Sequence, residues 1–302
     1  MKPIISVITC THNPRLDYLD KVLGALSCQS LPMEQWEFLL IDNASSKLLS
    51  AEIHLRWHPL ARHIREDQLG LTYARLRGIY EAEAELLVFV DDDNVLEPNY
   101  LESAFQISKI WPSLGVWGGQ IKASFEDIAP DWSKPYWYLL GIRRFEKNSW
   151  SNLLHQQVTT PYGAGMVVRK AVARAYTDLV RHDPRRLNLG RKGDSLISCE
   201  DTDLAFTACD IGLGTGMFTS LELTHLIPVT RLQEEYLLKL CEAISYSSTM
   251  LESFRDKFPP SVSRSEKIFE TFQLWRMNPR KRRFKMAMKR GQLLALNKIK
   301  QS

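Results

Sequence analysis

The 302-residue sequence has only five cysteines, an odd number, and contains no Cys-x-x-Cys spacing. We therefore expect neither a disulfide framework nor a zinc site, and a reducing cytoplasm suits this composition. No apolar run approaches the length of about 18 residues that a membrane-spanning helix needs. The apolar run at the N-terminus is also too short for a signal peptide. Any membrane contact is then expected to be peripheral, at the inner face.

A strong excess of one charge is missing as well. The formal net charge is +4, with 25% charged and 44% hydrophobic residues, which is ordinary for a soluble globular protein. This weakly basic balance suits an anionic ligand but does not predict a nucleic-acid partner, for which no motif is present either. There is no internal repeat or low-complexity tract. The length fits one large domain, or a domain with an appendage.

Apolar runs and helical spacings alternate along the first 120 residues. We expect strands at 4–10, 37–41, around Ile64, at 86–90 and at 114–117. Helices are expected at 16–26, at 72–85 and after Pro98. Strands that alternate with helices of this length are typical of βαβ units. The sequence therefore predicts an α/β fold with a mostly parallel sheet flanked by helices.

The second half of the chain has a different character. An aromatic-rich stretch at 131–150 has little periodicity and is interpreted as a loop or flap. A strand is expected at 161–168, a short helix at 200–209, and helices from 231 onward. We therefore predict one domain at 1–230 and a basic helical extension at 231–302.

Three consecutive carboxylates, Asp91, Asp92 and Asp93, follow the buried strand at 86–90. In open α/β sheets ligands bind at the carboxyl ends of strands, and three adjacent negative charges repel one another unless a cation or donors lie nearby. On an extended strand Asp91 and Asp93 would point to the same side. Mg²⁺ and Mn²⁺ prefer such oxygens and share them with phosphates. The alternative interpretation is a solvated acidic turn.

Polar residues also follow the first two predicted strands. Thr9, Thr11 and Asn13 are small donors and acceptors that suit contact with a nucleotide, and Arg15 could reach phosphate. The same residues could instead begin a helix. Asp42 could accept the imide N–H of a uracil ring, or it could form a turn within its Asp-Asn-Ala-Ser segment.

Three further residues are candidates for chemistry. Arg75 lies in the first turns of a predicted helix and could contact a diphosphate, or could face solvent. Asp201 could act as a general base, although a helix start favours carboxylates in any case. His225 could be a metal ligand beside the acidic triplet, although a single histidine is more often structural.

Taken in order, these segments resemble glycosyltransferase family 2, the inverting nucleotide-sugar transferases with the GT-A fold. The resemblance extends over residues 4–231. A glycine loop at 162–170 and His225 also match the family's pattern. The resemblance to this family rests on five motifs: ISVITCTHN, LLIDNAS, LGLTYARLRG, VFVDDDN and SCEDTDLAF.

This resemblance implies a role for each matching residue. Asp42 would bind uracil, and Asp91, with its neighbour Asp92, would contact the donor at the ribose. Asp93 and His225 would hold Mn²⁺ or Mg²⁺, and Asp201 would be the base. The family often has glycine in place of Cys199, and its glycine loop often differs from 163–165 here. Neither departure removes a chemical group that the reaction needs.

The implied reaction moves a sugar from a nucleotide-sugar, with a UDP-sugar expected, to an acceptor hydroxyl. The acceptor would be a glycan or a lipid-linked saccharide, as in bacterial surface polysaccharide synthesis. Two other classes stay open: a catalytically inactive binding or scaffold subunit, and a sugar nucleotidyltransferase. Nucleotidyltransferases of this fold begin with a glycine-rich, basic loop after the first strand, and residues 9–15 contain no glycine.

The segment at 278–300 carries nine lysine or arginine residues with apolar residues between them. A basic amphipathic segment can lie on an anionic lipid surface, which would suit a lipid-linked acceptor. The alternative interpretations are a solvated tail and an oligomer contact.

Overall fold

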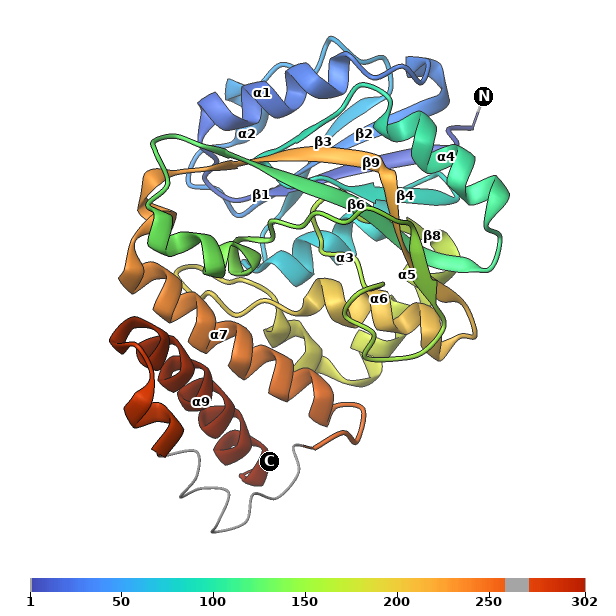
Figure 1. Cartoon of the computed structure of the whole chain (residues 1–302). Helices are drawn as coiled ribbons and strands as arrows, with labels where there is room; N and C mark the ends of the chain where they lie inside the picture. Colours follow the sequence, from blue (N-terminus) through green and yellow to red (C-terminus); the bar gives the residue numbers. More distant parts are fainter. Residues whose placement is uncertain (1, 259–271, 302) are drawn as a thin grey trace.

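The computed structural model describes residues 2–258 and 272–301 (Figure 1). Their nine strands are Ile5–Thr11 (β1), Trp36–Asn43 (β2), Ala61–Glu66 (β3), Leu86–Phe89 (β4), Asn94–Leu96 (β5), Leu114–Phe125 (β6), Ser149–Ser151 (β7), Val167–Arg169 (β8) and Gly214–Ile227 (β9). Within the described residues they form one sheet in the order β3-β2-β1-β4-β8-β6-β9-β5, with β7 paired to β9.

The direction of the strands divides this sheet into two parts. Strands β3, β2, β1 and β4 run parallel, as the βαβ pattern predicts. Strand β8 then lies antiparallel between β4 and β6, while β5 and β7 lie antiparallel to β9. Strands β6 and β9 are parallel to each other. The complete sheet is therefore mixed, with its parallel part in the N-terminal half.

Helices cover both faces of the sheet. They span Leu16–Ser27 (α1), Leu49–Glu52 (α2), Leu71–Glu81 (α3), Tyr100–Ile110 (α4), Lys170–His182 (α5) and Glu200–Asp210 (α6). Short 3₁₀ helices lie at Met33–Gln35 (η1) and Pro184–Leu189 (η3). One core forms under α1, α2 and α4, and another under α3, α5 and α6 (Figure 1). Successive residues of β2 enter opposite cores, because side chains alternate along a strand.

Several predicted elements have different bounds in the structure, and the strand expected at 114–117 continues to Phe125. The strand expected at 161–168 forms only at Val167–Arg169, because the chain turns before it at Gly165, whose φ is +69°. Tyr100 Oη donates to the carbonyl oxygen of Gly165 at 2.6 Å and holds this turn. The helix expected at 72–85 ends at Glu81.

The C-terminal part adds a third core. Four helical elements contribute residues to this core: η2 (Asp131–Leu140), η4 (Val229–Leu232), α7 (Glu234–Ser253) and α9 (Pro279–Lys300). The aromatic stretch expected as a flap thus begins as a 3₁₀ helix, and its Tyr136 ring stacks on Phe284 of α9 with centroids 3.6 Å apart. Helices were expected from 231 onward, and of that segment residues 259–271 lie outside the described residues.

Helix α9 lies along α7 on the side away from the sheet (Figure 1). The two helices approach closely at Gly291, where a Cβ would overlap the carbonyl oxygen of Glu242. Among the described helices, none combines the length and the apolar character needed to cross a bilayer.

Candidate active site

A cavity of about 630 Å³ opens at the carboxyl ends of β1 and β4. Its wall includes seven of the predicted site residues: Thr11, Arg75, Asp91, Asp92, Asp93, Asp201 and His225. Thr9, Asn13 and Asp42 do not line it. The position matches the rule that open α/β sheets bind ligands beyond the carboxyl ends of their strands.

The acidic triplet occupies a turn. Strand β4 ends at Phe89, and the Asn94 amide donates to the carbonyl oxygen of Asp91 at 3.0 Å. The expectation that Asp91 and Asp93 share one side of an extended strand is therefore wrong, although both line the cavity. Thr11 Oγ1 donates to Asp92. Burial, followed by the charge of Asp93, raises the pKa of Asp92 to about 7.

Asp93 meets His225 because β5, which begins one residue after Asp93, pairs with β9. Asp93 Oδ2 lies 3.3 Å from His225 Nε2. His225 Nδ1 lies 2.9 Å from the carbonyl oxygen of Leu140 and donates to it, because a carbonyl oxygen can only accept. Burial alone would raise the pKa of Asp93, but His225 and Arg231 outweigh it and hold that pKa below its usual value.

Arg231 completes this group and was missed from the sequence. Its Nη1 lies 3.1 Å from Asp93 Oδ2 and 3.1 Å from His225 Nε2. Arg231 is the last residue of the Leu223–Arg231 segment in which His225 was identified as a candidate. Nothing in that local sequence indicated that Arg231 contacts Asp93 and His225.

Arg75 connects two acidic segments across the cavity. It is buried on α3, with Nη1 3.0 Å from Glu200 Oε1 and Nη2 3.7 Å from Asp91 Oδ1. Gly163 packs directly against this guanidinium, where a Cβ would not fit. Burial raises the pKa of Glu200 to about 7 in spite of Arg75. In the structure Arg75 therefore holds carboxylates in place, and its contact with a diphosphate stays a prediction.

Asp201 faces the cavity from the first turn of α6. Its Oδ2 accepts a hydrogen bond of 2.7 Å from the Gly163 amide, and its Oδ1 accepts one of 2.6 Å from the Thr202 amide. The glycine loop thus orients this carboxylate. That arrangement is what a general base requires, namely one oxygen held in place beside a substrate cavity.

Asp42 is buried in a turn at the end of β2. Its carboxylate accepts from the amides of Ser45 and Leu49, at 3.1 and 3.3 Å, and pairs with Arg65 Nη1 at 2.8 Å. Burial raises its pKa, but these hydrogen bonds outweigh burial and the pKa is lowered. The turn that the sequence left open as an alternative is therefore present, and contact with uracil stays a prediction.

Three other residues predicted to contact the nucleotide, Thr9, Asn13 and Arg15, do not line the cavity. The Thr9 hydroxyl is buried in β1 and has no hydrogen-bond partner among the described residues. Asn13 has a φ of +48°, and its side-chain oxygen accepts from Ser46. Arg15 pairs with Asp17 and Glu126 rather than reaching into the cavity.

The wall opposite the sheet comes from α7, one of the C-terminal helices expected from 231 onward. Its cavity-lining residues recur at nearly every fourth position, as one face of a helix does. They are Tyr236, Leu240, Ile244, Ser248, Leu251 and Glu252. Arg191 and Lys192 add positive charge to the same cavity. The predicted boundary at 230 therefore falls between two parts of the chain that line one cavity.

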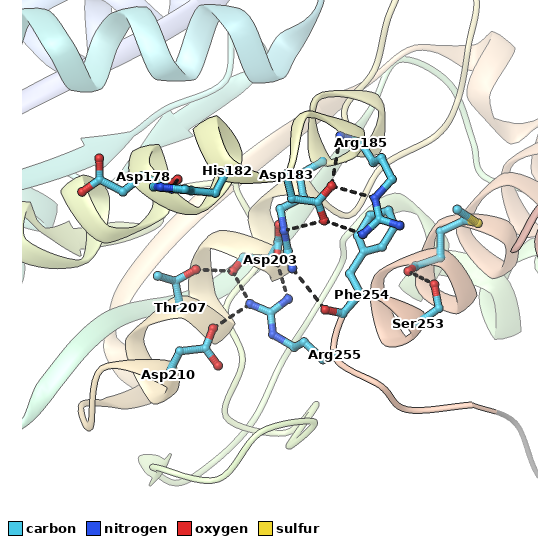
Figure 2. A network of polar contacts seen from close by, with 12 residues as sticks. Asp178, His182, Asp183, Arg185, Asp203, Thr207, Asp210, Ser253, Phe254 and Arg255 are labelled. Atoms are coloured by element: carbon cyan, nitrogen blue, oxygen red, sulfur yellow. Dashed lines mark hydrogen bonds and ion pairs between the residues drawn. The ribbon is translucent and has the colours of Figure 1, made fainter. Parts of the chain in front are cut away.

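A buried charge network ties α6 to the end of α7, and Figure 2 shows Arg255 reaching Asp203 and Asp210. Asp203 has no exposed surface and also pairs with Arg186 at 2.6 Å. Arg186 in turn donates to the carbonyl oxygen of Phe254 at 3.2 Å. Because Asp203 lies two residues after Asp201, this network fixes the helix that carries the candidate base.

Comparisons with known proteins identify the family of this chain. A family model described as glycosyl transferase family 2 matches residues 6–176, more than half of the chain. The chain belongs to glycosyltransferase family 2. The resemblance stated from the sequence motifs is therefore confirmed.

Two curated relatives match a shorter segment. Glycosyltransferase AglE of Haloferax volcanii is 29% identical over 103 residues, 33% of this chain and 34% of AglE. A Bacillus subtilis glycosyltransferase, TuaG, named for a role in teichuronic acid biosynthesis, is 27% identical over 109 residues, 35% of this chain and 42% of TuaG. The match thus spans less than half of either relative.

Solved structures of S. aureus TarS share the fold. The structure of its residues 1–349 in complex with UDP has a TM-score of 0.53 at 17% identity, covering 82% of this chain and 65% of that one. The complex with UDP-GlcNAc gives the same TM-score, with 82% and 66% covered. The predicted α/β fold of the GT-A type, with helices at its C-terminus, is confirmed.

Proposed function

We propose that this family 2 protein is an inverting, metal-dependent glycosyltransferase that moves a sugar from a UDP-sugar to an acceptor hydroxyl. The observation that carries the proposal is the position of Asp201, which faces the Asp91–Asp93 turn across one cavity and is held by the Gly163 amide. The TarS complexes with UDP and UDP-GlcNAc support this class of donor by analogy of fold.

The chain's own residues divide the work between them. Asp201 takes the proton from the acceptor hydroxyl as the hydroxyl oxygen attacks the anomeric carbon. The bond to the diphosphate breaks on the opposite side, so one displacement inverts that carbon and needs no second nucleophile. Arg191 and Lys192 line the same cavity and offset the charge that develops on the leaving diphosphate.

Asp93 and His225 would supply only part of the coordination shell of a divalent ion. Within residues 2–258 and 272–301, no three His, Cys, Asp or Glu side chains gather as a metal site. Mg²⁺ and Mn²⁺ commonly bind one or two protein groups and complete their shell with substrate phosphates and water. A bound ion would act as a Lewis acid toward the leaving diphosphate. The pair therefore suits an ion that arrives with the donor.

The acceptor is proposed to be a glycan or a lipid-linked saccharide, in surface polysaccharide synthesis. The family membership and the biosynthetic role for which TuaG is named support this class. An inactive scaffold subunit would not need Asp93, Asp201 and His225 around one cavity, which speaks against that alternative.

We also propose that α9 contacts an anionic membrane. Phe284, Ala287, Gly291 and Ala295 are buried at helical spacing, so the opposite side of α9 faces outward. That outward side carries exposed Met286 and Leu293, together with basic residues such as Arg282 and Lys285. Apolar side chains flanked by cations match an anionic lipid surface.

Calorimetry with UDP, GDP and CMP, each with and without Mn²⁺, tests the donor and the metal. We expect UDP to bind best and its affinity to rise with Mn²⁺. Equal binding of the three nucleotides would reject the uracil preference. UDP binding that is unchanged by Mn²⁺ would reject the metal dependence.

A further inference from the structure

Arg231 occupies the place where Asp93 and His225 converge. Its Nη1 lies 3.1 Å from Asp93 Oδ2 and 3.1 Å from His225 Nε2, so one nitrogen of the guanidinium contacts both atoms that would ligate an ion. The Arg231 guanidinium therefore satisfies both potential ligands from within the chain.

We propose that Arg231 is an internal cation that blocks the metal pair until the donor binds. A divalent ion at Asp93 and His225 needs the same lone pairs, and it would stand beside a second positive charge. The guanidinium must then leave the pair. The inference rests on the proposed function, and it adds that ion and donor bind as a coupled set.

The surroundings of Arg231 allow this displacement. The residue lies in η4, just after β9, and its side chain is 27% exposed, against 12% for His225 and 13% for Asp93. Arg231 also lines the cavity, so its guanidinium can turn toward the cavity without crossing a packed core.

The donor offers the displaced arginine a new partner. The cavity has to receive the diphosphate near Asp91–Asp93, and charge-assisted hydrogen bonds from a guanidinium to phosphate are strong. Donor binding therefore lowers the cost of freeing Asp93 and His225. By thermodynamic reciprocity, the ion must raise the affinity for the donor by the same factor.

The test is calorimetry on the full chain with Mn²⁺ alone, UDP alone and both together. For Arg231→Gln we expect Mn²⁺ alone to bind at least about tenfold more tightly than in the unmodified protein, and the coupling between Mn²⁺ and UDP to shrink. Arg231→Lys keeps a charge but lacks the planar fork, so an intermediate Mn²⁺ affinity is expected.

The matched control is Arg191→Gln, which removes a positive charge from the same cavity. Its Mn²⁺ affinity should rise much less, because no hydrogen bond links Arg191 to the Asp93 or His225 side chain in the described structure. An equal rise in both variants would mean that general charge, rather than occupation of the pair, sets the affinity, and the inference would be wrong.

The remaining outcomes separate the inference from the proposed function. If Arg231→Gln binds Mn²⁺ alone no more tightly than the unmodified protein, while both bind UDP with Mn²⁺, the inference fails and the proposed function stands. If the unmodified protein binds no UDP at any Mn²⁺ concentration, the proposed function fails and the inference fails with it. Should Arg231→Gln not fold, the Arg231→Lys comparison decides.

Discussion

The proposed reaction makes its most specific prediction for the Asp201 side chain. Asp201→Asn keeps the hydrogen-bond acceptor for Gly163 but removes the basic oxygen. Loss of a general base costs roughly 10²–10⁴-fold in rate. We expect sugar transfer to fall by this amount, while UDP binding changes little, because the base acts in the transition state.

The control for this variant is Asp127→Asn, an exposed carboxylate outside the cavity. Transfer is measured with a panel of UDP-sugars and acceptor glycans, and binding is measured by calorimetry. Near-normal turnover in Asp201→Asn would mean that Asp201 only stabilises the start of α6.

Glu200 makes stability depend on pH. Burial raises its pKa from 4.5 to about 7 in the folded protein, so between these values the folded state holds a proton that the unfolded state has lost. Stability should therefore fall as the pH rises from 4.5 through 7, by roughly 3 kcal/mol from this group alone.

Urea unfolding at pH 5, 6, 7 and 8 measures that slope. Glu200→Gln mimics the protonated carboxyl beside Arg75, so its stability should be close to that of the unmodified protein at pH 5 and should decline less as the pH rises. Parallel curves for the two proteins would contradict the assignment to Glu200.

At the scale of elements, the contact between α6 and the end of α7 depends on Asp203. Asp203→Asn leaves the buried guanidinium groups of Arg186 and Arg255 with a neutral partner. Breaking a buried ion pair in this way costs about 3–5 kcal/mol, which denaturant unfolding can measure. Asp210→Asn is the matched variant, because its carboxylate is partly exposed and, within the described part of the chain, pairs only with Arg255. For Asp210→Asn we expect a loss of about 1 kcal/mol or less, and equal losses would contradict the prediction.

Helix α9 carries the prediction of membrane contact. The protein should sediment with anionic liposomes at low salt and detach at high salt, because screening weakens the attraction. The double variant Arg282→Glu/Lys285→Glu should bind far less. Arg290→Glu is the control, since it replaces a basic residue of α9 that is paired with Glu242. If the unmodified protein ignores anionic liposomes at low salt, the membrane interpretation is wrong.

For the molecule as a whole, the sequence predicted what depends on local pattern. Buried strands such as β1 and β2 are rich in apolar residues, and helices such as α1 show regular spacing. Strands β5 and β7 have only three residues each, too few for a periodic signal, and β5 forms because β9 lies beside it.

The residues of the candidate site likewise divide into those that local motifs indicate and those that depend on contacts between distant segments. The acidic triplet, Asp201 and His225 follow recognisable motifs, so they were found. Arg231 and the α7 wall depend on contacts between segments that are distant in sequence, and no local pattern reports those. Asp42 shows both limits, because its local turn was one of the alternatives that the sequence offered, whereas its ion pair with Arg65 of the neighbouring strand was not indicated.

The ion pair between Asp203 and Arg255 also limits when this part of the protein can fold during synthesis on the ribosome. The two residues are 52 positions apart in the chain. At about 5–20 residues per second, roughly 3–10 s pass between the addition of the first and of the second. During that interval Asp203 of α6 has Arg186 but lacks its second buried cation, Arg255, and the cavity lacks its wall from α7. The nascent protein therefore acquires a complete active site only when most of its chain has been translated, although every motif of the family was made earlier.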